Sequence, residues 1–280
     1  MREINILDIT QAVKELCIKA NLYMPDDVHA RIKECKKLET SEIGKRIFDT
    51  MEKNIEIAKE KQIPICQDTG MALIFVEIGQ DVHIVGGNLE KAINEGVRQG
   101  YIEGFLRLSI LSDPLEGVNT NDNTPAVIYT DIVDGDKISI MIAPKGFGSE
   151  NMSKLQTFRP SATPKDVEDF IVEACFSAGS NPCPPIVVGV GIGGTSDKAM
   201  LLSKKAMLRD LDTKNSSELY AKMESEILRR VNESKIGPQG LGGDITALSV
   251  AIEQFPSHIA GFPCGVSIGC HVTRHMSITL

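Results

Sequence analysis

The spacing of apolar positions in the first sixty residues indicates helices. Apolar residues recur every three or four positions over 6–20 and again over 43–58, with Lys and Glu between them. Two acidic residues, Asp26 and Asp27, favour the start of a middle helix over 26–38, because carboxylates stabilise the amino-terminal end of a helix. We therefore expect a helical region over residues 1–62.

Shorter apolar runs follow and predict strands. Residues 72–78 are typical of a buried strand, and 82–85 of a second short one, followed by a helix over 89–101. Two β-rich runs, 126–133 and 137–143, are joined by Asp134-Gly135. Because this dipeptide favours a tight turn, the pattern predicts that the two runs form a hairpin.

The second half of the chain alternates helices and strands. Thr163-Pro164-Lys165-Asp166 is a capping box with proline at the first helical position, and the helix should run to about Ala178. Further patterns predict strands at 186–190 and 264–271, and helices at 196–208 and 217–231. The fold class is mixed α/β (α+β), with a central sheet and flanking helices. Without a linker, repeat or low-complexity tract, we expect one domain over 1–280 whose core is 63–280.

Composition narrows the class of protein. Hydrophobic residues are 42% and charged residues 24% of the 280 residues, as in soluble globular proteins. A net charge of -8 and only 5% aromatic residues argue against a nucleic-acid-binding surface. Locally placed arginines still permit a small anionic substrate.

The cellular compartment affects how the cysteines are interpreted. No apolar run approaches the roughly 18 residues that cross a bilayer, and the amino terminus lacks the pattern of a secretory signal. We therefore expect a cytoplasmic protein. Its seven cysteines are then interpreted as thiols or metal ligands rather than disulfides.

One loop is denser in reactive groups than any other stretch. A thiol, an amide, a carboxylate and a hydroxyl stand in consecutive positions between Pro64 and Gly70, in the run Cys66-Gln67-Asp68-Thr69. Proline and glycine interrupt regular structure, so these side chains are presented together on a loop. The long polar segment 111–125 is a second candidate functional loop.

The cysteines allow a metal site but do not prove one. Their spacing contains no C-x-x-C pair, which excludes a zinc ribbon or a ferredoxin-type motif. Three cysteines lie within helical periodicity and are interpreted as small buried apolar residues: Cys17, Cys35 and Cys175. Four lie in or beside loops: Cys66, Cys183, Cys264 and Cys270. For each of these, an inert structural thiol is the alternative.

Two other kinds of site deserve a test. Gly189-x-Gly191-x-x-Gly194 follows a strand and precedes a helix, as in an NAD-binding fingerprint, but no strand precedes the acidic Asp210. The alternative is a turn in which glycine permits close packing. A second hypothesis makes Cys66 a nucleophile with a histidine base; the candidates are His258, His271 and His275. That hypothesis leaves the neighbouring amide and carboxylate without a role.

Several motifs occur together in a recognisable order. They are Cys66-Gln67-Asp68-Thr69-Gly70, the Arg107 segment, Lys145-Gly146-Phe147-Gly148-Ser149-Glu150-Asn151, Asn181-Pro182-Cys183-Pro184-Pro185, the turn 189–194 and Cys270-His271-x-x-Arg274. In this order they resemble the alpha subunit of class I iron–sulfur fumarases and L(+)-tartrate dehydratases. The resemblance covers nearly the whole chain, from about residue 8 to the end.

The resemblance implies a [4Fe–4S] cluster held by three cysteines. The matching positions are Cys66, Cys183 and Cys270, and Cys264 remains open as the third ligand. Three ligands for four irons leave one iron open, which can act as a Lewis acid on a substrate hydroxyl and carboxylate.

The resemblance also implies roles for neighbouring residues. Gln67 and Asp68 match a substrate-contacting pair, and Arg107 matches an arginine that holds a substrate carboxylate. Gly148 matches a main-chain contact to substrate. His258 matches a histidine that hydrogen-bonds the aspartate, so Asp68 and His258 would form a proton-handling pair.

The function that the resemblance implies is that of a hydro-lyase. Our first expectation is reversible hydration of fumarate to L-malate, and the close alternative is dehydration of L(+)-tartrate to oxaloacetate. The single-chain members have a further domain that this sequence lacks, so we expect a separate beta subunit that completes the active site in an alpha2beta2 assembly. A non-catalytic iron–sulfur scaffold is the alternative from a different class.

Overall fold

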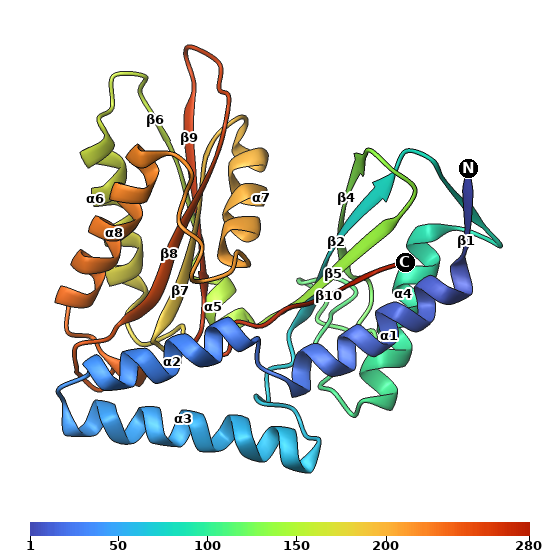
Figure 1. Ribbon diagram of the computed structural model, residues 1–280, viewed down its shortest axis with the longest axis horizontal. Helices are drawn as coiled ribbons and strands as arrows, with labels where there is room; N and C mark the ends of the chain where they lie inside the picture. Colours follow the sequence, from blue (N-terminus) through green and yellow to red (C-terminus); the bar gives the residue numbers. More distant parts are fainter. The chain divides into compact units, whose positions relative to one another are not determined.

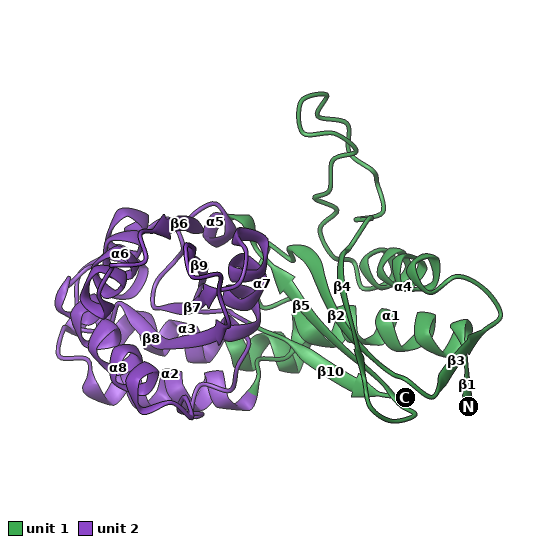
Figure 2. Ribbon diagram, turned by 90° about the horizontal axis from the view of Figure 1, so that it is seen from above, with its two compact units in different colours: residues 1–25, 55–147, 274–280 green, residues 26–54, 148–273 purple.

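The apolar side chains gather in two separate clusters, and each is the core of one compact unit. The computed structural model describes residues 1–280. Unit 1 contains residues 1–25, 55–147 and 274–280, and unit 2 contains residues 26–54 and 148–273 (Figure 2). The expectation of one domain over 1–280 stays a prediction. One of the points at which the chain passes from one unit to the other lies inside the helix α3 (Glu42–Lys61), so no linker composition marks that boundary.

Unit 1 is a four-stranded sheet packed against two helices. The strand order is β10 (Met276–Thr279), β5 (Ile138–Lys145), β2 (Met71–Gly79) and β4 (Val127–Val133). The helices α1 (Ile6–Leu22) and α4 (Leu89–Glu103) pack on each other, and α1 contacts β5. A short parallel pair, β1 (Arg2–Asn5) with β3 (Val82–Val85), completes the unit. The apolar faces of these elements form its core.

The predicted hairpin between residues 126–133 and 137–143 is wrong in its pairing. Both strands exist, but β2 lies between them, parallel to β4 and antiparallel to β5. The connection passes around the end of β2, where Gly79 N donates to Lys137 O and Asp81 N donates to Gly135 O. Strand β2 is buried along most of its length, and burial on both faces favours its central position.

Unit 2 is a four-stranded sheet covered on both faces. The strand order is β6 (Lys154–Phe158), β9 (Phe262–Gly269), β7 (Ile186–Gly193) and β8 (Ala247–Phe255). Figure 1 shows α6 (Pro164–Ala178) and α8 (Glu218–Glu233) on one face and α7 (Ser196–Met207) on the other. The helix α2 (Asp26–Leu38) and the single turn α5 (Phe147–Glu150) complete the regular elements near the site.

Local sequence signals predicted several helix ends. The Thr163 side chain accepts from Asp166 N and the Asp166 carboxylate accepts from Thr163 N, so the predicted capping box is confirmed. Helix α2 begins at Asp26 and ends at Leu38, as its acidic start indicated.

The glycines of β7 serve close packing rather than dinucleotide binding. A Cβ atom at Gly189 would collide with Ser203 O, and one at Gly191 would collide with Ala199 O, both in α7. The residues after α7 that include Asp210 form an irregular segment rather than the end of a strand. The NAD-binding hypothesis is therefore replaced by its packing alternative.

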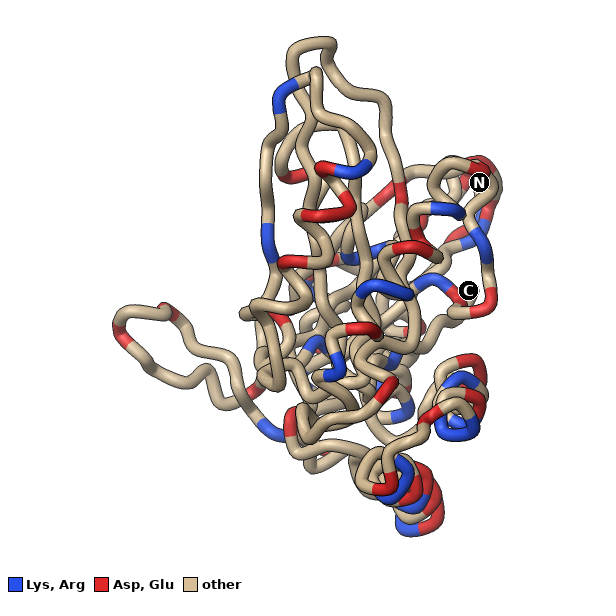
Figure 3. The backbone as a smooth tube through the Cα atoms, turned by 90° about the vertical axis from the view of Figure 1, so that its left-hand side faces the viewer, with Lys and Arg blue, Asp and Glu red and all other residues tan.

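Charge is spread along the chain. Lys and Arg are interspersed with Asp and Glu (Figure 3), and many form ion pairs within one helix, such as Lys165 with Asp169. No helix has both the length and the apolar character to cross a membrane. The fold is thus mixed α/β, as expected, with its sheet strands divided between two units.

Candidate functional site

The loop before β2 holds its carboxylate in a fixed orientation. Asp68 Oδ1 accepts from Gly70 N at 3.0 Å, and Asp68 Oδ2 accepts from Phe147 N at 3.0 Å. The main-chain carbonyl of Asp68 accepts from Arg274 Nη2 at 2.9 Å, and the same guanidinium donates to Asn21 Oδ1. Arg274 is buried. The segment just before β10 therefore holds Asp68 through Arg274, and Asn21 of α1 holds Arg274 in turn.

Gly146 leaves the space that the carboxylate needs. A Cβ atom at this position would lie 2.9 Å from Asp68 Oδ2. Such a contact is tighter than side chains tolerate, so any larger residue would displace either the carboxylate or the turn that carries Phe147. The motif glycine before Phe147 thus acts through Asp68.

Thr69, which follows Asp68, is hydrogen-bonded to the segment that carries Arg107. Arg107 N donates to Thr69 Oγ1 at 2.9 Å, and Thr69 Oγ1 lies 3.3 Å from Arg107 O. The buried Tyr101 donates its hydroxyl to Thr69 O at 2.8 Å, and burial raises its pKa. Asn123 Nδ2 donates to Gly70 O at 3.2 Å. Together these bonds couple the reactive loop to the long loop between α4 and β4.

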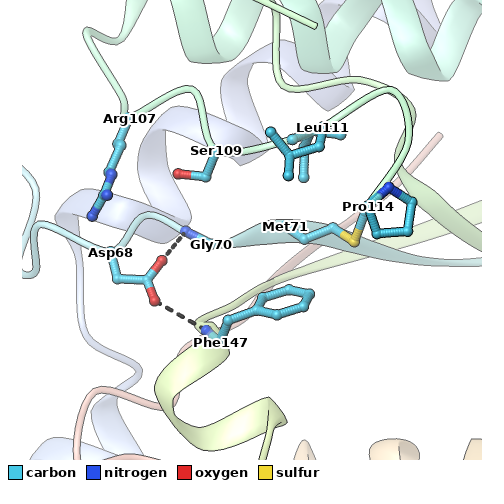
Figure 4. Close-up of a pocket in the computed structure, with 9 residues that line it drawn as sticks. Asp68, Gly70, Met71, Arg107, Ser109, Leu111, Pro114 and Phe147 are labelled. Atoms are coloured by element: carbon cyan, nitrogen blue, oxygen red, sulfur yellow. Dashed lines mark hydrogen bonds between the residues drawn. The ribbon is translucent and has the colours of Figure 1, made fainter. Parts of the chain in front are cut away.

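Asp68 and Arg107 line one cavity of about 520 Å³ in unit 1. Figure 4 shows Arg107, Ser109 and Asp68 toward one end, and Met71, Leu111 and Pro114 toward the other. The Arg107 side chain is exposed. The irregular segment that supplies much of this wall projects from unit 1 in Figure 2, so the predicted functional loop contributes to the cavity.

A guanidinium beside a hydrogen-bonded carboxylate can bind a small hydroxy acid and exchange a proton with it. A guanidinium matches the geometry of a carboxylate and can donate two parallel bonds. The neighbouring Asp68 is placed to exchange a proton with a hydroxyl in the same cavity. Gln67 is exposed and Cys66 is partly exposed on the same loop, so both side chains can reach a ligand.

The cysteines of unit 2 emerge at one end of its sheet. Cys183 lies three residues before β7, and Cys270 directly follows β9. Strands β7 and β9 are antiparallel, with Val187 opposite Gly269, so these two chain ends meet. His271 N donates to Cys183 O at 3.4 Å, and His271 Nδ1 lies 3.0 Å from the same oxygen. The structure therefore brings the two predicted ligands to adjacent segments.

The two cysteines near the carboxyl end differ in burial. Cys264 lies within β9, fully buried in the core of unit 2, and burial raises its pKa to about 12. Metal binding requires the thiolate, which this burial disfavours at Cys264. Cys35 and Cys175 are also buried, with pKa values raised by burial to about 11 and about 12, and burial raises the pKa of Cys17 as well. Only Cys66, Cys183 and Cys270 keep exposed surface.

His258 lies away from these cysteines within unit 2. It is exposed in the connection between β8 and β9, where Ala260 N donates to its Nδ1 at 3.1 Å. The register pairs Phe255 with Gly193, at the opposite end of β7 from Cys183. The eight residues of β7, at about 3.3 Å each, separate the two ends.

Gly148 is exposed in the turn α5, immediately after Phe147. A Cβ atom there would meet only Asn181 O, at 3.4 Å. Its backbone is therefore accessible to a ligand.

Comparison with known proteins identifies the family. The model of the fumarate hydratase (Fumerase) family matches residues 10–279. A protein of Methanocaldococcus jannaschii, named as a candidate L(+)-tartrate dehydratase subunit alpha, is 40% identical over 274 residues, covering 96% of each chain. The L(+)-tartrate dehydratase subunit alpha of Escherichia coli O157:H7 is 32% identical over 269 residues, covering 95% of this chain and 88% of the relative.

The fold, the arginine–carboxylate cavity and these matches define a hydro-lyase, an enzyme that adds or removes water. The chain belongs to the fumarate hydratase (Fumerase) family.

Sequence reasoning missed several residues that shape this site. The Phe147 N–H and the Arg274 side chain hold Asp68, and Gln239 contacts both Pro184 O and His271. The glycine-rich loop around Gln239 was visible in the sequence, but its partner segment was not. No local pattern gives the partner of a loop that packs on residues fifty positions away.

Proposed function

We propose that this chain is the alpha subunit of an iron–sulfur hydro-lyase that dehydrates L(+)-tartrate to oxaloacetate. The observation that supports it most is the cavity that Asp68 and Arg107 both line. Asp68 lies on the loop that also carries Cys66, and Phe147 N holds its carboxylate. The relatives named above support the substrate. Our first expectation, fumarate and malate, becomes the second candidate, which the name of the family favours.

The cysteines fit the proposed [4Fe–4S] cluster by their chemistry and exposure. Cys66, Cys183 and Cys270 are the three thiols outside the cores, whereas the other four are buried with raised pKa values. Cys66 belongs to unit 1 and the other two to unit 2, so neither unit alone holds a group of three. Arg274, four positions after Cys270, binds the carbonyl of Asp68, two positions after Cys66. This chain connection supports a shared cluster.

The chain's own residues would bind and orient the substrate. When bound, a cluster with three cysteine ligands supplies an open Lewis-acidic iron. Arg107 holds one substrate carboxylate by charge-assisted bonds, and the main-chain N–H of Gly148 and the amide of Gln67 hold other substrate oxygens. Asp68, fixed by Gly70 N and Phe147 N, handles the proton of the leaving hydroxyl.

The proton-handling pair of Asp68 and His258 stays a proposal. Within unit 2, His258 lies at the far end of the sheet from Cys183 and Cys270. We propose that the His258 of each pair reaches the Asp68 of a second copy, in an assembly that contains two alpha chains.

A separate beta subunit is the proposed partner. The relatives are named as alpha subunits, and such a name implies a second kind of subunit. We propose that the partner completes the active site and that the assembly is alpha2beta2, as in the sequence analysis. Gln67 and Arg107 are exposed in this chain, and the partner would cover them only in the assembled enzyme.

The test is an assay of the assembled, anaerobically reconstituted enzyme. The chain is produced with the beta-type subunit from its own genome, loaded with iron and sulfide, and given L(+)-tartrate, L-malate and fumarate in turn. We expect oxaloacetate formation from L(+)-tartrate at a kcat/KM at least tenfold above that for malate. Faster turnover of malate or fumarate would reverse the choice of substrate, and an inactive complex with a full cluster would contradict the proposal.

A further inference from the structure

The two cysteines of unit 2 are joined by a network that no sequence motif predicted. Gln239 Nε2 donates to Pro184 O at 2.9 Å, and Gln239 N donates to the same oxygen at 2.8 Å. Gln239 Nε2 also lies 3.2 Å from His271 Nδ1, which in turn lies 3.0 Å from Cys183 O. In either tautomer the imidazole bonds to one of these two groups. Gln239 and His271 therefore connect the segment after Cys183 with the one after Cys270.

The backbone at both ends of this contact is held in an uncommon conformation. Cys183 has a φ of 54° and Gln239 a φ of 55°. Residues other than glycine rarely adopt the left-handed region, and each such residue needs support from surrounding structure. The hydrogen bonds to Pro184 O provide that support on both sides.

The loop that carries Gln239 has a buried anchor. The Glu39 side chain is almost fully buried, and its carboxylate accepts from Asp244 N at 2.9 Å, Ile245 N at 3.0 Å and Ser41 N at 2.8 Å. Gly242 N donates to Ile236 O at 2.9 Å and closes the loop. Two main-chain donors of this loop, Asp244 N and Ile245 N, thus bond to one buried carboxylate, which holds the end of the loop in place. Gln239 thus extends from a fixed base toward the cysteines.

We propose that Gln239 and His271 are positioning residues that hold the Cys183 and Cys270 segments together before a cluster binds. The inference rests on the proposed cluster site of this chain. Outer residues that orient metal ligands commonly change metal affinity by about 10-fold to 100-fold when replaced. The network gives unit 2 a preformed pair of thiols, so that unit 1 need contribute only Cys66.

Four variants and a control test this role. Gln239→Glu keeps the shape of the side chain but removes its N–H donors. Gln239→Ala removes the shape and the donors together. His271→Ala removes the ring, whereas His271→Asn keeps an N–H donor near the position of Nδ1. Gln254→Ala is the control, because Gln254 is an exposed glutamine on β8 of the same unit.

Two measurements are made on each purified chain. Hydrogen exchange of the cluster-free chain reports the network directly, in peptides covering 236–243 and 270–273. Retention of the cluster is measured after anaerobic reconstitution. The rate of iron release to a chelator is followed by the loss of cluster absorbance. We expect faster exchange and iron release about tenfold faster in the two Gln239 variants and in His271→Ala. We expect rates near those of the unmodified chain in His271→Asn and Gln254→Ala.

The outcomes separate the two proposals. If the unmodified chain takes up no cluster, the proposed function fails, whatever the variants do. If it takes up a cluster and the Gln239 variants and His271→Ala exchange hydrogen and release iron at its rates, the positioning role is overturned while the cluster stands. If His271→Asn released iron as fast as His271→Ala, the positioning role would also be overturned, since an N–H donor at that position would then have no effect. Circular dichroism confirms folding, and a variant that does not fold is replaced by its conservative partner.

Discussion

The carboxylate of Asp68 accepts a hydrogen bond from the main-chain N–H of Phe147 at 3.0 Å, across the space that Gly146 leaves open. This contact joins the loop before β2 to the turn after β5, the two motifs most distinctive in the sequence. It fixes one carboxylate oxygen while the other accepts from Gly70 N. Orientation of the proposed proton-handling group therefore depends on the space that Gly146 leaves.

Replacing Gly146 by alanine should impair catalysis without removing the cluster. The added Cβ would lie 2.9 Å from Asp68 Oδ2, so the carboxylate must move. A displacement of about 1 Å in a catalytic group can cost about 100-fold in rate. We expect kcat to fall by about that factor, with iron and sulfide content unchanged. A normal kcat in Gly146→Ala would show that the orientation of Asp68 is unimportant.

Replacing Arg107 by lysine should weaken substrate binding despite the retained charge. Lysine offers a point charge instead of a planar fork, so it loses the bidentate match to a carboxylate. We expect kcat/KM to fall about 100-fold, which corresponds to about 2.7 kcal/mol. Arg98→Lys, on the exposed face of α4 where Arg98 pairs with Glu95, is the matched control. Equal kinetics in the two variants would exclude Arg107 from the substrate site.

The loop that carries Gln239 should lose stability in acid through Asp244. Hydrogen bonds from Lys235 and then Thr40 hold the pKa of Asp244 well below its usual range. A depressed pKa in the folded state means that the stabilisation is present above the unfolded pKa of about 3.9 and is lost as the pH falls. The urea midpoint of the native chain should exceed that of Asp244→Asn at pH 6, and the gap should narrow below about pH 4. A gap independent of pH would contradict the assignment.

Mixing two inactive variants tests whether His258 acts on a second copy. Asp68→Asn and His258→Asn chains are co-expressed with the beta-type subunit and compared with each variant alone. If the residues of one site come from different chains, a mixed pair contains one intact site, and random pairing should restore about a quarter of the activity. Activity no higher than that of the separate variants would place both residues of a site on one chain or give His258 no role.

Local signals predicted the fold better than long-range pairing. The capping box at Thr163 and the acidic start of α2 were confirmed because they act within one turn of helix. The predicted hairpin of β4 and β5 was wrong because β2, which is distant in sequence, lies between the two strands and pairs with both. The boundary between units was invisible because α3 runs through it.

The site was predictable as residue types but not as geometry. The Cys66 loop and Arg107 were identified, and the structure places Asp68 and Arg107 on one cavity. The difference in burial between Cys264 and Cys270 was not visible in the sequence, since the strand pattern includes both. The roles of Gln239 and Glu39 needed tertiary contacts between loops.

The central claim is that Cys66, Cys183 and Cys270 hold the cluster. Each is replaced by serine, and Cys264→Ala is the control because Cys264 is buried in the unit 2 core. After anaerobic reconstitution, iron and sulfide content and visible absorbance are measured together. The account predicts that each serine variant fails to retain a [4Fe–4S] cluster, whereas Cys264→Ala retains it. A full cluster in any of the three serine variants, or its loss only in Cys264→Ala, would contradict the account.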